Sequence, residues 1–158
     1  MSADAPFRLS RWIPLGALLA GLAVAAGALG AHGLDGRFQV QYRGRVYSKK
    51  LPDQSQSDPV PLAAKRLADF RTGTEYHMAH ALALLVVGLL AGHRPGRLVH
   101  VAGGCFLAGI ALFSGGLYGL AVFDQPMLGA SIVPIGGVLF IVGWLCLMIA
   151  AISRMEPD

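Results

Sequence analysis

The chain has 158 residues, of which 54% are hydrophobic and 14% charged, and its mean hydropathy is +0.57. So few charged side chains could not cover the surface of a soluble domain, so the composition predicts an integral membrane protein. The net charge of +4 comes from the predicted loops, where no basic stripe alternates with aromatic residues, which favours contact with lipid headgroups and argues against nucleic acid as a partner.

The first predicted transmembrane span covers about residues 12–34 and follows a basic start. At about 1.5 Å per residue, this stretch is long enough to cross a hydrocarbon core of about 30 Å. A signal peptide is the alternative interpretation, but the apolar stretch is too long for one. The small residues Gly27, Gly30 and Gly33 predict that another helix packs closely against this span.

The stretch between the first two spans, residues 35–73, is polar and charged. Residues 38–42 and 45–49 flank Arg43 and Gly44, and we expect a two-residue turn there to form a β-hairpin. An isolated hairpin is marginal in water, so its apolar face needs a membrane surface, another part of this protein or a partner chain. We expect a partner to bind this loop at Phe38, Val40, Tyr42, Arg43, Arg45 and Tyr47.

Residues 61–71 predict a short amphipathic helix that leads into the second span. Ala63, Leu67 and Phe70 would share its apolar side, and Lys65, Arg66 and Asp69 would lie elsewhere on its surface. We expect this helix to lie along the membrane interface.

Three more apolar stretches predict spans at about residues 74–92, 98–123 and 127–152. Short turns join them, so the sequence predicts an all-α membrane protein, an antiparallel bundle of four transmembrane helices that forms one domain over residues 1–158. Pro134 predicts a kink near the start of the fourth span, because proline lacks a backbone N–H. Small residues predict close helix packing at Ala111, Gly115, Gly119, Gly136 and Gly137.

The basic residues and the cysteines give two further expectations. Lys and Arg are more numerous in the first loop than on the face that carries both termini, so the positive-inside rule predicts a cytoplasmic first loop. Cys105 and Cys146 both lie in apolar stretches, which favours two packed, reduced thiols over a disulfide.

Polar side chains gather at the membrane face that carries the first loop. In an antiparallel bundle, the first and third spans end at this face and the second and fourth begin there. The simplest interpretation is structural, with interhelical hydrogen bonds of about 1 kcal/mol each holding the bundle in register. The residues of this predicted polar cluster are His32, Glu75, His77, His80, Ser114, Tyr118, Asp124 and Ser131.

The sequence leaves two functional alternatives open for this cluster. Glu75, His77 and His80 are candidates for moving protons or small solutes, because histidine changes charge near neutral pH. His77 and His80 also lie on one side of a helix, as two ligands of a transition metal would, but their spacing is not that of a zinc protease motif. The sequence contains no nucleophile elbow, phosphate-binding glycine loop or paired catalytic carboxylates, so we expect no catalytic residue, bound metal or cofactor.

Four stretches together carry a resemblance to a known family: GALGAHGL (27–34), TGTEYHMAHALALL (72–85), FSGGLYGLAV (113–122) and LGASIVPIGGVLFIVGW (128–144). The chain resembles the domain of unknown function 423 family, small four-helix membrane proteins that include the YgdD-like and transmembrane protein 256-like proteins. The resemblance implies a multi-pass protein of the bacterial inner (plasma) membrane, with the mitochondrial inner membrane as the alternative, and implies no activity. The family's first loop is typically shorter, so residues 37–61 resemble an insertion.

These observations favour a non-catalytic structural or accessory subunit of a larger inner-membrane complex. We expect it to contact membrane lipids and to bind other integral membrane subunits through its helix faces and its first loop. A small transporter or proton-conducting protein that uses Glu75, His77 and His80 is the alternative, and a homo-oligomer is also open.

Overall fold

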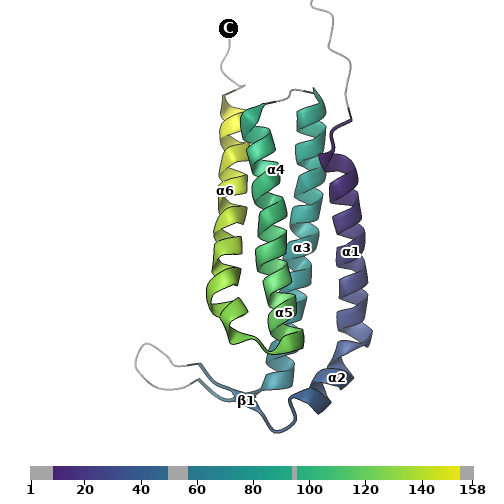
Figure 1. Ribbon diagram of the computed structural model, residues 1–158, viewed down its shortest axis with the longest axis vertical. Helices are drawn as coiled ribbons and strands as arrows, with labels where there is room; N and C mark the ends of the chain where they lie inside the picture. The colour runs from purple at the N-terminus through teal and green to yellow at the C-terminus, as the bar shows by residue number, and fades with distance from the viewer. Residues whose placement is uncertain (1–8, 50–56, 94–95, 154–158) are drawn as a thin grey trace, which may run out of the picture.

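The computed structural model describes residues 9–49, 57–93 and 96–153, and these are mostly helical (Figure 1). Within these ranges, four helical segments are long and apolar enough to cross a membrane: Trp12–His32, Leu62–His93, Arg97–Phe123 and Leu128–Ile152. In chain order the elements are α1 (Trp12–His32), α2 (Leu34–Gln41), β1 (Val46–Tyr47), β2 (Val60–Pro61), α3 (Leu62–His93), α4 (Arg97–Gly109), η1 (Ile110–Ser114), α5 (Gly115–Phe123), η2 (Leu128–Ile132) and α6 (Val133–Ile152).

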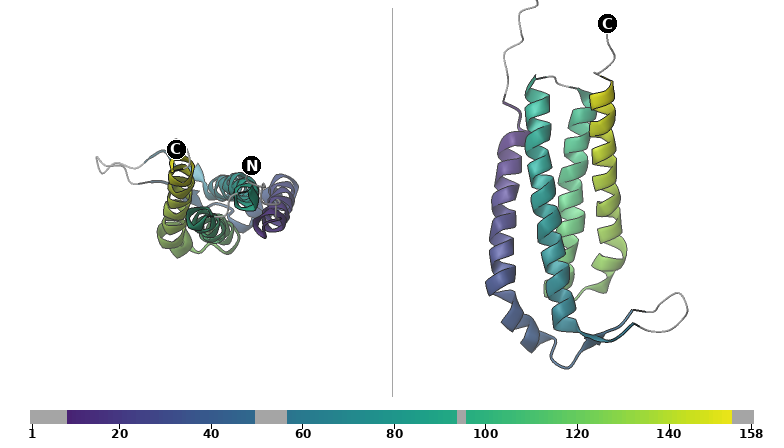
Figure 2. Two further views of the ribbon diagram at one scale, coloured as in Figure 1. Left: turned by 90° about the horizontal axis from the view of Figure 1, so that it is seen from above. Right: turned by 180° about the vertical axis from the view of Figure 1, so that it is seen from behind.

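The long helical segments lie side by side, with α3 in a central position (Figure 1). α1 packs along α3, α3 also contacts α4 and α5, and α6 packs along α4. Viewed from above, α1 and α6 lie at opposite edges of the molecule (Figure 2). The start of α1 and the end of α6 lie at one end of the molecule, and α2, the strands and the start of α3 lie at the other, which we call the loop end (Figure 1).

Two hydrophobic clusters hold these helices together. The larger one lies between the long helices and includes Trp12, Leu84, Phe106 and Phe140. Glycine allows the close approach that this packing needs, because a Cβ atom at Gly136 would lie only 2.4 Å from the backbone nitrogen of Phe113 in η1. The smaller cluster lies at the loop end, where α2 and the start of α3 cover the end of α5, and contains Leu34, Phe38, Tyr42, Leu62, Ala63, Leu67, Phe70 and Ala121.

The first loop differs from the prediction, and the expected hairpin around Arg43 and Gly44 is wrong. Residues 38–41 are helical, in α2. Phe38 and Tyr42 are four residues apart, so a helix places both on one side, where they are only 1% and 2% exposed. The hydrophobic cluster at the loop end thus buries two aromatic rings that a free-standing hairpin would leave in contact with water.

Short strands do form in this loop, but between other residues. β1 and β2 pair antiparallel, with Val46 opposite Pro61 and Tyr47 opposite Val60. The helix expected over residues 61–71 is not a separate interfacial helix, because α3 continues unbroken from Leu62 to His93. The stretch expected to be an insertion, residues 37–61, includes residues 50–56, which lie outside the described part of the chain.

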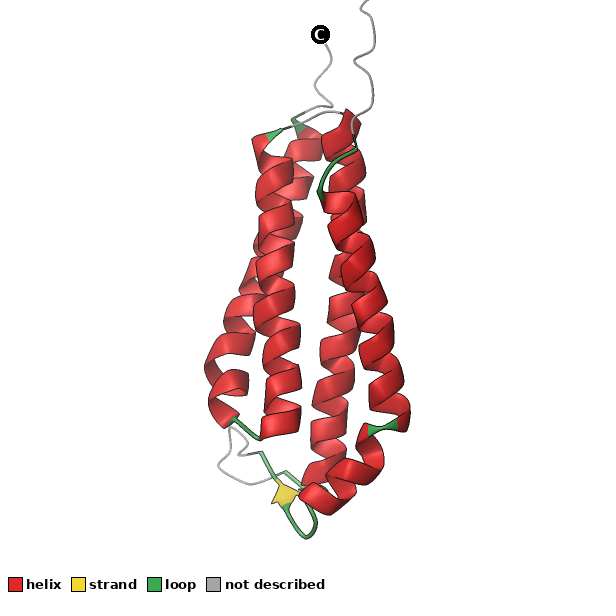
Figure 3. Cartoon of the chain, turned by 45° about the vertical axis from the view of Figure 1, so that its right-hand side comes forward, coloured by secondary structure: helices red, strands yellow, loops and turns green. Residues whose placement is uncertain are grey.

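The kink expected near Pro134 takes the form of a widened, π-helical turn. This turn, η2, immediately precedes α6, and Pro134 lies in the first turn of α6. Proline cannot donate a hydrogen bond to the carbonyl four residues earlier, so regular helical bonding fails where η2 occurs. The lower end of this helix bows outward as a result (Figure 3).

Candidate functional site

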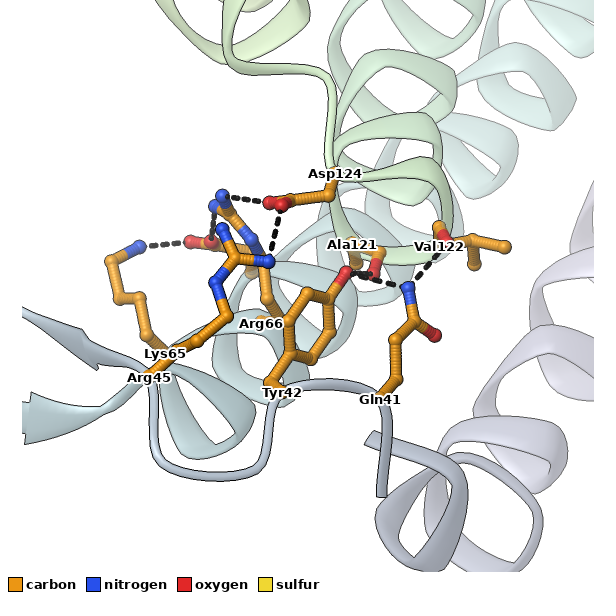
Figure 4. Close-up of polar contacts among 9 residues, drawn as sticks. Gln41, Tyr42, Arg45, Lys65, Arg66, Ala121, Val122 and Asp124 are labelled. Carbon is orange, nitrogen blue, oxygen red and sulfur yellow. Dashed lines mark hydrogen bonds and ion pairs between the residues drawn. The ribbon is translucent and has the colours of Figure 1, made fainter. Parts of the chain in front are cut away.

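The end of α5 is fixed to the first loop by a network of ion pairs (Figure 4). Asp124 directly follows α5 with a left-handed backbone (φ 52°), and its N–H donates to the Leu120 carbonyl at 3.1 Å. Its carboxylate accepts a hydrogen bond from Arg66 Nη2 at 2.7 Å and forms an ion pair with Arg45 Nη1 at 2.8 Å. One carboxylate therefore joins the turn after α5 to α3 and to the residue before β1.

A second carboxylate extends this network along α3. Arg66 Nη1 lies 3.5 Å from Asp69 Oδ2, and Lys65 Nζ also pairs with Asp69. These pairs have helical i, i+3 and i, i+4 spacing, which places their side chains next to each other. We call Arg45, Lys65, Arg66, Asp69 and Asp124 the loop-end network.

Two side chains from the end of α2 complete the contact with α5. The Tyr42 hydroxyl donates to the Ala121 carbonyl at 2.7 Å, and Gln41 Nε2 donates to the Val122 carbonyl at 3.2 Å (Figure 4). Both carbonyls belong to the last turn of α5, where carbonyls have no acceptor role inside the helix. The first loop thus caps the end of this helix.

The electrostatics of the network favour an ionised Asp124. Burial raises the pKa of this carboxyl group, but the hydrogen bonds and positive charges of Arg66 and Arg45 outweigh burial and hold the pKa below its ordinary value. Burial, assisted by the negative charge of Asp124, raises the pKa of the Tyr42 hydroxyl, so this group stays protonated as a donor at neutral pH.

Sequence reasoning placed Asp124 in a polar cluster but missed its partners. Arg66 was expected on the polar surface of an interfacial helix, yet its side chain is only 10% exposed. The available signal was the spacing of Lys65, Arg66 and Asp69, which favours pairing on one helix face. Nothing in the sequence links Arg66 to a carboxylate 58 residues further along the chain.

The predicted histidines lie deeper, between the long helices. His77 Nδ1 lies 3.3 Å from the Tyr118 hydroxyl, which donates to Thr74 Oγ1 at 3.4 Å. Two buried atoms in this region, His77 Nε2 and Ser114 Oγ, have no hydrogen-bond partner among the described residues. The polar group formed by Thr74, His77, Ser114 and Tyr118 is therefore incompletely paired.

His80 is fully engaged by its surroundings. Its Nδ1 lies 2.8 Å from the Tyr76 carbonyl, and Trp144 Nε1 donates to its Nε2 at 3.3 Å. The two contacts together fit one neutral tautomer, with the proton on Nδ1. The ring also stacks on Phe140, with centroids 3.4 Å apart. Neither ring nitrogen is left to bind a metal.

The other members of the predicted polar cluster lie apart from the histidines. His32 and Ser131 are exposed, and Glu75 is exposed on a groove between α2 and α3 that Asp35 and Arg71 also line. In the described ranges, no three His, Cys, Asp or Glu residues lie close enough together to hold a metal ion. The structure therefore divides the predicted cluster into the loop-end network, the interior histidines and separate surface residues.

The small residues singled out in the sequence mainly serve packing inside this chain. A Cβ atom at Gly30 would approach Phe70, and one at Gly119 would approach Leu128. Gly136 lies closest to another helix, at Phe113, and Gly27 and Gly137 make ordinary van der Waals contacts with Thr74 and Phe113. Gly33 contacts Leu29, four residues earlier in the chain, and Ala111 and Gly115 are exposed.

The residues expected to bind a partner through the first loop are similarly divided. Phe38 and Tyr42 are buried in the loop-end cluster and are not available on the surface. Val40, Arg43 and Arg45 are exposed, and Tyr47 is half-buried.

Comparison with known proteins finds relatives over nearly the whole chain. The family model described as "Protein of unknown function (DUF423)" matches residues 26–137. The chain is similar to the UPF0382 membrane protein YwdK of Bacillus subtilis, with 44% identity over 145 residues that cover 91% of this chain and 98% of that protein. A UPF0382 membrane protein of Staphylococcus epidermidis is 42% identical over 142 residues, which cover 90% and 95% of the two chains. No solved structure matches the chain significantly.

Proposed function

Since the chain belongs to the DUF423 family of membrane proteins, as its four sequence motifs predicted, we propose that it is a non-catalytic accessory subunit that binds another integral membrane protein through the outward face of α1. It is a multi-pass bacterial membrane protein. We also propose that its four long helical segments cross the membrane as one antiparallel bundle, with residues 35–73 at the cytoplasmic face and residues 37–61 as an insertion particular to this chain.

The observation that carries this proposal is the outward face of α1. In the most apolar stretch of α1, 17% of the residues are buried, compared with 39% and 44% in the most apolar stretches of Leu62–His93 and Arg97–Phe123 and 22% in that of Leu128–Ile152. The side of α1 that faces away from α3 exposes a row of small residues at helical spacing: Ala17, Gly21, Ala25 and Ala28. Such rows let two helix backbones approach closely in a membrane, where packing rather than the hydrophobic effect drives association.

This face is a better candidate for a partner than the first loop. The aromatic side chains that made the loop attractive, Phe38 and Tyr42, are buried within the protein. On α1, a Cβ atom added at Gly21 would meet no neighbouring atom of the described residues within 4 Å. Gly21 therefore has no packing role in the described part of the chain, and its neighbours in the row, Ala17, Ala25 and Ala28, are exposed as well.

Two matched glycine substitutions test the proposal. Gly21 and Gly104 are both exposed, on α1 and α4, and both have open space where a side chain would grow. Gly21→Leu should block close docking on α1, and Gly104→Leu should leave it intact. After extraction in a gentle detergent, size separation and mass spectrometry should find a partner protein in stoichiometric amount with the natural chain and with Gly104→Leu, and no partner with Gly21→Leu. Migration of the natural chain alone would overturn the proposal.

A second candidate function is proton or small-solute movement, and the incompletely paired polar group favours it. His77 Nε2 and Ser114 Oγ are buried without partners in the described structure, and His77 is the titratable member of this pair. On this alternative, His77→Gln should abolish a proton flux in reconstituted vesicles, while the exposed control His32→Gln should not. Glu75→Gln, which removes the predicted carboxylate, should also lower the flux in the same assay. Unchanged flux in all three variants would exclude this function.

A further inference from the structure

A pocket of about 410 Å³ lies at the loop end, beside the ion-pair network. It lies between β1 and the start of α3 on one side and the end of α5 and η2 on the other. Its polar wall contains Tyr47, Lys65, Arg66 and the carboxylate Asp69, and its apolar wall contains Leu117, Leu120, Pro126, Gly129 and Ala130. We propose that this pocket binds an anionic phospholipid, with the phosphate on the polar wall and the start of the acyl chains on the apolar wall.

The charges of the polar wall favour an anion. The charged residues that line the pocket are the cations Lys65 and Arg66 and the carboxylate Asp69, so two positive charges face one negative charge and one positive charge remains. The loop-end network as a whole has the same excess, with three cations and two carboxylates. A phosphodiester carries one negative charge and would neutralise it. Guanidinium groups suit phosphate oxygens particularly well, because their planar N–H groups match the spacing of those oxygens.

Two features of the polar wall prepare it for this ligand. Arg66 is 9% exposed, and its Nε has no hydrogen-bond acceptor in the described part of the chain. The Lys65 side chain is 33% exposed, and its ammonium group is held by Asp69 and lies 5.4 Å from the centre of the Tyr47 ring. A fixed but accessible ammonium group can contact a phosphate with little loss of side-chain freedom.

The apolar wall distinguishes a lipid from free phosphate. The apolar wall lies at the end of α5 and the start of the next helical segment, where a membrane-spanning helix reaches the headgroup region. Leu117 and Leu120 are buried at its base (7% and 8% exposed), and Pro126 and Ala130 provide its exposed apolar surface. A free phosphate ion would gain nothing from this surface, whereas the glycerol and first methylene groups of a lipid would bury apolar surface against it. This step rests on the proposed placement of the helices across the membrane. The same placement puts the pocket at the cytoplasmic leaflet, where anionic lipids collect.

Native mass spectrometry of the full chain tests the proposal. The purified protein is exposed to equal amounts of phosphatidylglycerol and phosphatidylcholine, and bound lipid is counted per chain. We expect phosphatidylglycerol to be retained preferentially. Lys65→Gln should lower its retention about fivefold, as expected for the loss of one basic residue at a membrane surface. The control Arg97→Gln removes an exposed basic residue at the opposite end of the molecule and should have no effect.

Further arms of the experiment make the outcome decisive. If Lys65→Gln does not fold, Ala130→Glu replaces it: this residue is exposed, so the fold should tolerate the change, and the new carboxylate should repel the lipid phosphate. Equal retention of the two lipids would overturn the proposal. Displacement of phosphatidylglycerol by inorganic phosphate at millimolar concentration would also overturn it, because the pocket would then recognise phosphate alone.

Discussion

Replacing Asp124 by asparagine should destabilise the protein by about 2 kcal/mol, because it removes the charge that pairs with a buried arginine. Asparagine has nearly the same shape and tolerates the left-handed backbone that position 124 adopts (φ 52°). It can also still accept a hydrogen bond. The expected loss therefore reports the ion pair and not a change in backbone strain or side-chain volume.

The magnitude follows from the exposure of the two arginines. The Arg66 side chain is 10% exposed and its Nη2 lies 2.7 Å from the carboxylate, so this charged hydrogen bond contributes about 1.5–3 kcal/mol. Removing one partner of a fully buried pair costs more, about 3–5 kcal/mol, but Arg66 keeps a contact with Asp69 at 3.5 Å. The Arg45 side chain is 53% exposed, and its pair with Asp124 contributes about 1 kcal/mol at most.

The assay is reversible unfolding in mixed micelles, followed by circular dichroism as a denaturing detergent is added. Asp124→Asn and Arg66→Gln should each cost about 2 kcal/mol, and Arg45→Gln should cost about 1 kcal/mol or less. A double-mutant cycle between positions 66 and 124 should give most of the loss as coupling energy. If Arg45→Gln costs as much as Arg66→Gln, burial does not determine the strength of these pairs and the reasoning is refuted.

Three further predictions concern stability. Because the pKa of Asp124 is lowered in the folded protein, its ion pairs stabilise the fold at neutral pH and are lost as the pH falls below about 4. The difference in thermal midpoint between the natural chain and Asp124→Asn should therefore shrink at low pH, and an unchanged difference would contradict this. Tyr42→Phe should cost about 1 kcal/mol in the unfolding assay, because it removes the 2.7 Å hydrogen bond to the Ala121 carbonyl; a neutral result would show that water replaces this bond. Gly136→Ala should cost about 1–3 kcal/mol, because its Cβ would lie 2.4 Å from the backbone nitrogen of Phe113. The control Gly104→Ala, which has open space for a Cβ, should cost nothing. Equal effects of the two substitutions would show that close packing is not the cause.

The sequence was most informative where hydrophobicity alone decides the structure. Long apolar stretches predict membrane-crossing helices because a bilayer leaves no other way to satisfy a backbone in hydrocarbon. Four segments of the described chain have this length and composition. The four sequence motifs were equally informative about the family, which the comparisons show.

The first loop shows where such reasoning fails. Residues 38–42 alternate apolar and polar side chains as a strand does, but Phe38 and Tyr42 also have the four-residue spacing of a helix. The local sequence pattern alone does not distinguish a strand from a helix here, because the outcome depends on a hydrophobic cluster formed with Phe70 and with the end of α5. Tertiary contacts of this kind decide strand against helix in short segments.

The candidate site was predictable only in part for the same reason. Polar residues were expected at the loop end, and Asp124 does lie there in a network. Membrane topology, however, predicts only the approximate depth of a side chain and not its neighbour. His77 and His80 are three residues apart, yet one pairs with Tyr118 and the other with Trp144, on different helices.

The proposal that α1 binds another membrane protein is tested most directly by cross-linking in the native membrane. A photoreactive amino acid is placed at position 21 on α1 or at the matched exposed position 104 on α4. After illumination, position 21 should give one discrete adduct with another integral membrane protein, and position 104 should give adducts with lipid only. Lipid adducts alone at both positions would contradict the proposed role as an accessory subunit.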